Sequence, residues 1–164
     1  MNIPGLPLFI LGPDFFPGFT GTLRVFEPRY KQMMDDCIMD SKPFGYISAD
    51  PSKGELYGWS QPSDYGVICY VREYEESGSN LIIEVEATSA FVVEDVIQPV
   101  LPSLVDGERF PGVEELMEEA GNPQDGKLYL RADVEVLAAP DVDYVDGAFK
   151  AFADMLIPAR QILQ

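Results

Sequence analysis

Acidic side chains are the most abundant groups in this sequence that could do chemistry. The chain carries 28 aspartates and glutamates against 11 lysines and arginines, and it has no histidine. Two close carboxylates can serve as general acid and general base, as in glycoside hydrolysis, but with so many carboxylates close pairs arise by chance. The absence of histidine removes the commonest general base and transition-metal ligand, and it excludes Ser-His and Cys-His nucleophiles. The composition therefore favours a non-catalytic protein, with a small carboxylate-dependent hydrolase as an alternative.

Two acidic stretches resemble the start of a calcium-binding loop, but both lack the ligand on which such a loop depends. The twelfth position of an EF-hand loop supplies a bidentate glutamate. The stretch that begins at Asp50 has Gln61 at this position, and the stretch that begins at Asp141 has Phe152. The chain also has neither a P-loop nor a dinucleotide-binding glycine motif. We expect no metal site and no cofactor.

Aromatic side chains are the remaining candidates for a binding site. Phe15, Phe16 and Phe19 crowd one turn, and Tyr57 and Trp59 lie in a polar segment. Most aromatic residues of a small domain belong to its core, but exposed ones mark a binding surface because they contribute large contact areas. These five residues are the candidate protein- or peptide-binding site.

The net charge of the chain limits the classes of molecule that it can bind. A net charge of −17 repels phosphate backbones and anionic lipids, so we expect neither nucleic acid nor a membrane as partner. No apolar run approaches the ~20 residues that cross a bilayer, and the first residues lack the basic region and cleavage site of a secretory signal. These features favour a cytoplasmic protein, in which Cys37 and Cys69 are expected to be buried free thiols.

Hydrophobic patterning predicts a single α+β, mainly β domain over residues 1–164. Strands are expected over residues 6–11, 23–26, 44–47, 67–74, 81–87 and 90–96 and from 127 onward, with a loop or irregular hairpin over 50–64. In the last strand, Leu128, Leu130, Ala132, Val134 and Val136 are expected to point inward, and Tyr129, Arg131, Asp133 and Glu135 outward. Pro17-Gly18 favours a type II turn, because glycine tolerates a positive φ.

Three helices are expected between and after these strands. Pro28 suits a helix start, and the helix is expected to end near residues 40–42. Its apolar face is formed by Tyr30, Met33, Met34, Cys37 and Ile38. A short helix over 113–121 lies inside an acidic insertion, residues 98–126, and a C-terminal helix is expected over 148–163.

The order of several motifs resembles the N-terminal, substrate-binding domain of Lon protease. The first block comprises Leu6-Pro7-Leu8-Phe9, Phe16-Pro17-Gly18 and Leu23-Arg24-Val25-Phe26-Glu27-Pro28-Arg29-Tyr30. A second, Tyr129-x-x-Ala132-x-Val134-Glu135-x-Leu137, resembles the closing strand of that family. The resemblance implies a standalone family member with a PUA-like pseudo-barrel and a packed helix in its N-terminal half.

The resemblance also implies a non-catalytic role in holding unfolded or partner protein segments, for example as an adaptor in proteolysis or protein quality control. The ATPase and Ser-Lys peptidase domains of Lon are absent from this sequence, so those activities do not carry over. Because PUA-like folds often bind RNA, RNA binding remains an alternative. Arg24, Glu27 and Arg29 are expected to brace the start of the first helix by ion pairs.

Overall fold

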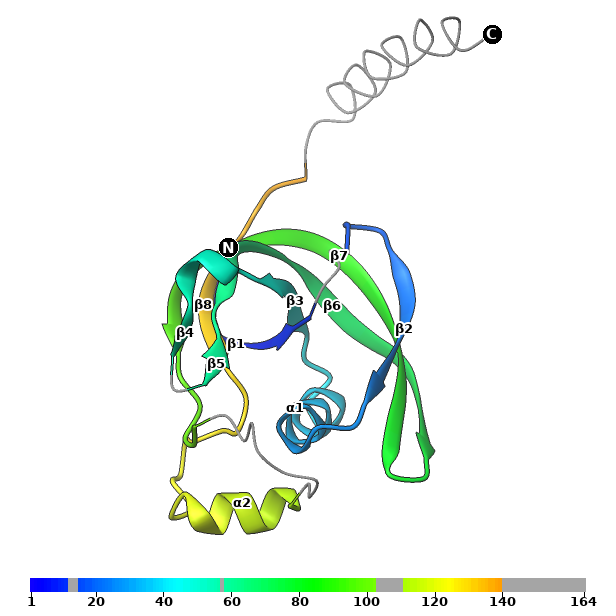
Figure 1. Ribbon diagram of the computed structural model, residues 1–164. Coiled ribbons are helices and arrows are strands. Elements are labelled where there is room, and N and C mark those ends of the chain that lie inside the picture. Colours follow the sequence, from blue (N-terminus) through cyan, green and yellow to red (C-terminus); the bar gives the residue numbers. More distant parts are fainter. Residues whose placement is uncertain (12–14, 57, 103–110, 140–164) are drawn as a thin grey trace, which may run out of the picture.

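The computed structural model describes residues 1–11, 15–56, 58–102 and 111–139 (Figure 1). Its strands are β1 (Asn2–Ile10), β2 (Thr20–Val25), β3 (Phe44–Ala49), β4 (Glu55–Leu56), β5 (Trp59–Ser60), β6 (Pro62–Ser77), β7 (Asn80–Ile97) and β8 (Arg131–Val136). Its helices are α1 (Pro28–Met39) and α2 (Val113–Glu119), with a 3-10 turn at Pro51–Lys53. The prediction of a mainly β domain with a helix in its N-terminal half is confirmed.

Five strands form a closed ring. β1 pairs with β3 in parallel and with β8 antiparallel, while β3 pairs with β6, β6 with β7, and β7 with β8. β6 and β7 extend beyond the ring, and the parts of the two strands outside the ring form a hairpin. β2 pairs with β7 along this hairpin. The predicted pseudo-barrel is therefore a ring with a three-stranded extension, β2-β7-β6, as Figure 1 shows.

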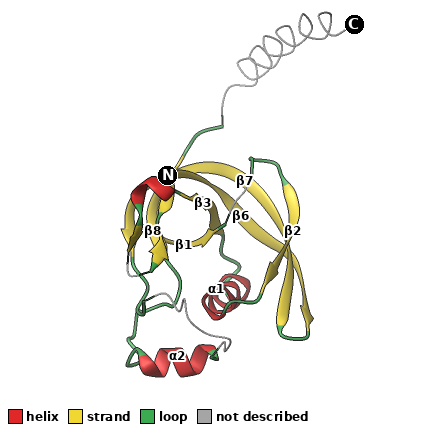
Figure 2. Cartoon of the chain, in the orientation of Figure 1, coloured by secondary structure: helices red, strands yellow, loops and turns green. Residues whose placement is uncertain are grey.

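The domain has two separate hydrophobic cores, and the same strands contribute to both. Successive side chains of a strand point to opposite faces, so alternate residues lie in different cores. In β3, Ile47 points into the ring and Tyr46 points out of it. The core inside the ring comprises Leu6, Leu8, Ile47, Ile68, Phe91, Leu130, Ala132 and Val134. The second core lies between the outside of the ring, the extension and α1 (Figure 2).

Helix α1 fills the space between the ring and the extension. It begins at Pro28, as predicted, and buries Tyr30, Met33, Met34 and Cys37 against the second core. At the C-terminal end of α1, the Lys42 amide donates a hydrogen bond to the Cys37 carbonyl oxygen at 2.9 Å and so caps the last turn. The helix face predicted from the spacing of apolar residues is confirmed.

Both cysteines are buried and form no disulfide, as predicted. Burial raises the pKa of the Cys37 thiol, and that of the Cys69 thiol, to about 12. A thiol with such a pKa stays protonated at neutral pH and reacts poorly, because the thiolate is the nucleophile. Both cysteines are therefore structural residues.

The segment 50–64, predicted as a loop or irregular hairpin, contains the small hairpin β4-β5 and also the first residues of β6. Other local predictions differ from the structure. The segments 81–87 and 90–96 are one strand, β7. Tyr129 was expected to point outward but is buried, because it precedes β8 and packs against α1 in the second core. The predicted middle helix is confirmed as α2, whereas the predicted helix over 148–163 lies outside the described residues.

Within the described ranges, no helix is both long and apolar enough to span a bilayer.

Candidate functional site: the aromatic turn and the ring column below it

The turn over residues 15–19, the aromatic turn, presents two phenylalanines to solvent. Phe16 is 72% exposed and Phe19 is 41% exposed. The Phe19 amide donates to the Phe16 carbonyl oxygen at 2.9 Å, and Gly18 has a φ of 88°. This is the geometry of the type II turn predicted from Pro17-Gly18.

Hydrogen bonds to β7 hold the aromatic turn in place. The Gly18 amide donates to the Ala87 carbonyl oxygen at 2.7 Å, and the Ala87 amide donates to the Phe19 carbonyl oxygen at 2.8 Å. The ring of Phe19 lies against Gly21 of β2, where a Cβ atom would clash with it. The exposed rings are thus carried by a fixed backbone, which lowers the entropy lost when they bind a partner.

Phe15 lies beneath these exposed rings and connects them to the core. Its ring is stacked on Tyr46 of β3, with centroids 3.9 Å apart and an interplanar angle of 5°. Its other neighbour is Phe19, at 4.4 Å between centroids. Phe15 is therefore a support for the surface, partly buried against the second core.

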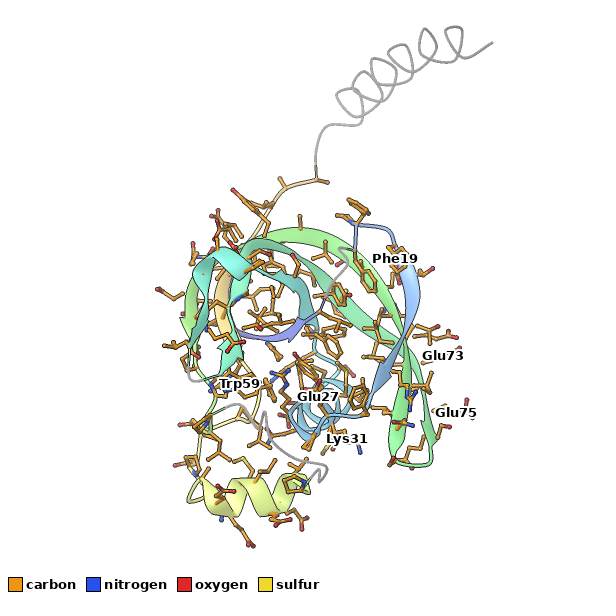
Figure 3. All side chains as sticks on the ribbon, viewed as in Figure 1. Phe19, Glu27, Lys31, Trp59, Glu73 and Glu75 are labelled. Atoms are coloured by element: carbon orange, nitrogen blue, oxygen red, sulfur yellow. The ribbon has the colours of Figure 1, made fainter. Side chains whose placement is uncertain are left out.

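The stack continues through the second core as a column of rings. Tyr46 lies 6.1 Å from Phe9 between centroids, and Phe9 is stacked on Tyr30 at 4.2 Å. The guanidinium of Arg29 lies over the Tyr30 ring at 4.4 Å and over the Trp59 ring at 4.2 Å. The column runs from the aromatic turn to Trp59. Figure 3 labels Phe19 and Trp59, near its two ends.

Trp59 lies at the interior end of this column. Its side chain is 6% exposed, and its indole N–H donates to the Leu101 carbonyl oxygen at 3.0 Å. Of the five candidate residues, the structure therefore brings Phe15, Phe16 and Phe19 together at one surface and places Trp59 inside the molecule. Tyr57 lies outside the described residues.

Arg29 is held in the column by an ion pair with Glu27, whose carboxylate lies 2.7 Å from its Nε atom. This pair confirms part of the predicted brace. Arg24 forms no ion pair with any residue in the described ranges. The guanidinium is flat and can lie between two rings, which an ammonium group cannot do equally well.

We therefore expect Arg29→Lys to lower the free energy of unfolding by about 1–2 kcal/mol, because it keeps the charge but loses contact with both rings. Urea denaturation monitored by Trp59 fluorescence measures this change. Arg24→Lys is the matched control, and it should change stability by less than about 0.5 kcal/mol. Equal effects of the two substitutions would show that the ring contacts contribute nothing.

A cleft of about 450 Å³ lies between β1, the C-terminal half of α1 and the start of β8. At its base, Asp36 accepts hydrogen bonds from the Tyr129 hydroxyl at 2.7 Å and from Lys127 Nζ at 2.9 Å. Burial raises the pKa of Tyr129, and the hydrogen bond to Asp36 raises it further. The Leu128 amide also donates to the Gln32 side chain at 2.8 Å. These bonds fasten α1 to the segment before β8.

Two of the three cations in this cleft form ion pairs with aspartates of this chain. Lys127 is paired with Asp36, and Lys42 is paired with Asp40 at 3.3 Å. Arg131 donates from Nη2 to the Asp125 carbonyl oxygen at 3.0 Å. Arg131 keeps its positive charge, because this partner is a neutral carbonyl group, and its buried Nε atom has no hydrogen-bond partner among the described residues.

The family model of the ATP-dependent protease La (LON) substrate-binding domain matches residues 5–163. The chain belongs to this family. The solved structures point to the same fold. One similar structure is a Lon N-terminal domain protein from Xanthomonas campestris, with 21% identity and a TM-score of 0.57, over 85% of this chain and 63% of that chain.

Another is the N-terminal domain of a Mycobacterium avium complex Lon protease, with 11% identity and a TM-score of 0.57, over 96% of this chain and 68% of that chain. This chain thus spans less than two thirds of the Xanthomonas protein. No curated protein sequence matches it. At these identities the likeness to solved structures establishes the fold alone.

The family motif of this Lon substrate-binding domain is explained by the ring column. Within Glu27-Pro28-Arg29-Tyr30, Pro28 begins α1, and the other three residues form the ion pair and the ring contacts next to Trp59. Sequence reasoning did not connect this motif with Phe15 or Trp59. Residues far apart in sequence meet here through side-chain packing between separate elements, and no local spacing signals these contacts.

Proposed function

We propose that this Lon substrate-binding domain holds unfolded or partner protein segments at its aromatic turn, as a non-catalytic adaptor in proteolysis or protein quality control. The observation that carries the proposal is the pair of exposed rings, Phe16 and Phe19, on a backbone fixed by hydrogen bonds to Ala87. Rigid exposed aromatic side chains are typical anchors of protein interfaces, since they bury a large area at low entropic cost.

The charges and pockets of the described residues favour this proposal over the two alternatives. RNA binding needs a basic groove, whereas the chain has a net charge of −17 and the cleft beside β1 has two of its three cations paired with aspartates. A carboxylate-dependent hydrolase needs close carboxyls in a deep pocket, one of them with a raised pKa. Among the described carboxyls, a raised pKa is resolved for Asp35, which lies on the exposed side of α1.

We expect Phe16→Ala to weaken binding of an unfolded protein by about 5- to 20-fold, the effect of removing one interface anchor. The measurement is a fluorescence anisotropy titration of labelled, reduced and alkylated lysozyme. Because Phe16 is exposed, its removal should leave the thermal unfolding midpoint unchanged, so the loss of affinity reports on binding alone.

Leu56→Ala is the matched control, because Leu56 is as exposed as Phe19 and lies on the β4-β5 hairpin. This variant should bind with the affinity of the parent protein. The proposed site is wrong if Phe16→Ala and Leu56→Ala bind equally well. The proposed function itself is wrong if the parent protein shows no binding at all.

A further inference from the structure

The outer half of β6 has a free edge. β6 spans Pro62–Ser77, but its pairing with β3 runs only from Pro62 to Cys69. β7 accompanies β6 on its other side as far as Ser77. No strand in the described part of the chain pairs with residues 70–77 on the side away from β7. The backbone groups on this side form an unpaired row, to which an extended polypeptide can add as a strand.

The hairpin register shows which backbone groups face this edge. Ser77 and Asn80 pair across the two-residue turn Gly78-Ser79, and such a pair exchanges both of its hydrogen bonds. Hydrogen-bonded pairs then alternate along the ladder. The N–H and C=O groups of Tyr74 and Glu76 therefore point outward, away from β7.

A groove runs beside this edge and separates it from the C-terminal end of α1. Its volume is about 300 Å³, and its lining includes Ile38, Val71 and Tyr74, together with Ser41 and Lys42. Tyr74 is 59% exposed. The lining is mixed, since Arg72 also contributes to it, and its apolar part is formed by Ile38, Val71 and Tyr74. An added strand beside Tyr74 would direct alternate side chains toward this apolar part.

The opposite face of the hairpin carries the glutamates Glu73, Glu75, Glu84 and Glu86, with Arg72 and Arg24 as the cations beside them. Glu73 lies directly across from Glu84, and Glu75 follows two residues later on the same face. Figure 3 shows Glu73 and Glu75 pointing away from the body of the domain. The only ion pair that the described residues form on this hairpin is Arg72–Glu86, at 2.7 Å. Like charges directly opposite each other destabilise a sheet, so cations from a partner would relieve this repulsion.

We propose that the free edge of β6 binds an extended segment of a partner polypeptide as an added antiparallel strand, in which apolar residues alternate with lysine or arginine. Apolar side chains opposite Tyr74 and Glu76 enter the groove beside α1. The basic side chains between them lie on the other face and reach Glu73 and Glu75. This inference rests on the proposed function in one respect, that the domain binds polypeptide, and it names a separate surface and the chemistry of the segment.

The test uses a labelled peptide of roughly ten residues that alternates lysine and valine, titrated against the whole chain by fluorescence anisotropy. In the proposed geometry the valine N–H groups donate to β6 and the lysine N–H groups point away. N-methylation of the valines should therefore weaken binding by about tenfold or more, and N-methylation of the lysines by less than about threefold. Equal effects of the two modifications would overturn the proposal.

Two pairs of protein variants test the edge itself. Glu76→Pro removes an outward N–H without breaking the ladder to β7, and it should bind the peptide about tenfold more weakly than Glu76→Ala, which removes only the charge. The double variant Glu73→Lys/Glu75→Lys should instead prefer a peptide of alternating glutamate and valine. Equal binding by Glu76→Pro and Glu76→Ala, or an unchanged peptide preference, would contradict strand addition.

The same experiment separates this inference from the proposed function. Phe16→Ala should bind the lysine–valine peptide as the parent protein does, because the peptide has no aromatic residue and its site lies on another strand. If the peptide fails to bind while unfolded lysozyme still depends on Phe16, the edge proposal is wrong and the aromatic turn stands. If the peptide binds but Phe16→Ala leaves the affinity for unfolded lysozyme unchanged, the edge proposal stands and the proposed aromatic-turn site is wrong.

Discussion

Phe91→Ala is expected to lower the free energy of unfolding by about 3–5 kcal/mol, the largest single-residue effect on this domain's stability. Phe91 is fully buried at the centre of the ring formed by β1, β3, β6, β7 and β8. Alanine would leave a cavity that the surrounding strands cannot fill, because their hydrogen-bonded pairing holds them apart. Urea denaturation monitored by Trp59 fluorescence measures the loss, and the thermal midpoint should fall by roughly 10 °C.

Gly45 offers a control that reports on the packing of Phe91 specifically. A Cβ atom at Gly45 would lie 2.8 Å from Phe91 Cζ and 2.8 Å from Leu8 Cδ2. Gly45→Ala should therefore cost about 1–3 kcal/mol by overpacking. In a Phe91→Leu background the added methyl group has more room, so its cost should be smaller by about 1 kcal/mol. Strict additivity of the two substitutions would contradict the close approach of Gly45 to the ring of Phe91.

Asp36→Ala is expected to cost about 2–3 kcal/mol, because it removes the acceptor shared by the Tyr129 hydroxyl and Lys127. Tyr129 is buried, so its hydroxyl would lose its partner in a site that water reaches poorly. The substitution also removes two of the three hydrogen bonds that fasten α1 to the segment before β8, and it leaves the bond between Gln32 and Leu128. Urea denaturation measures the change, and amide hydrogen exchange should show faster exchange at the C-terminal end of α1.

Tyr129→Phe separates the hydroxyl from the rest of this network. It removes one hydrogen bond but leaves the Asp36–Lys127 ion pair, so we expect a loss of about 1 kcal/mol. The double variant Asp36→Ala/Tyr129→Phe should be more stable than the sum of the single losses predicts, since no unpaired hydroxyl remains. If the double variant is only as stable as that sum, the hydrogen bond between the two residues contributes nothing.

Much of the fold could be predicted from the sequence, because its signals are local. The spacing of Tyr30, Met33, Met34 and Cys37 predicts which face of α1 is buried, and Pro28 predicts where the helix begins. Pro17-Gly18 predicts the type II turn that presents Phe16. Each of these predictions depends on residues a few positions apart, whose backbone preferences hold in any tertiary setting.

Only the structure shows which of the candidate aromatic residues are exposed and which are buried. Phe16 and Trp59 are both aromatic residues near turns, and nothing in their local sequence separates them. One is exposed and the other is buried, because the tertiary packing places Trp59 against Arg29 of α1 and Leu101. Burial depends on such contacts between distant segments, so composition and spacing cannot assign it.

Tyr129 shows the same limit within a strand pattern. Alternation predicts that it points away from the inside of the ring, which it does, but the outside of the ring is covered by α1 at this position. The two-residue period therefore determines the face on which a side chain lies. Only the tertiary structure determines whether that face meets water or another element, because a strand's own pattern does not record what packs against it.

The sequence by itself thus determined the mainly β composition, α1 and its buried face, the aromatic turn, the acidic surface and the family motif. Only the tertiary structure decided that the motif contributes to the ring column and that Asp36 fastens α1 to the segment before β8. It also decided that β6 extends beyond its pairing with β3 and so has a free edge. The physical reason is the same in each case. Backbone and solvation preferences depend on residues that are close in sequence. Contacts between distant residues and unpaired strand edges depend on how whole elements pack.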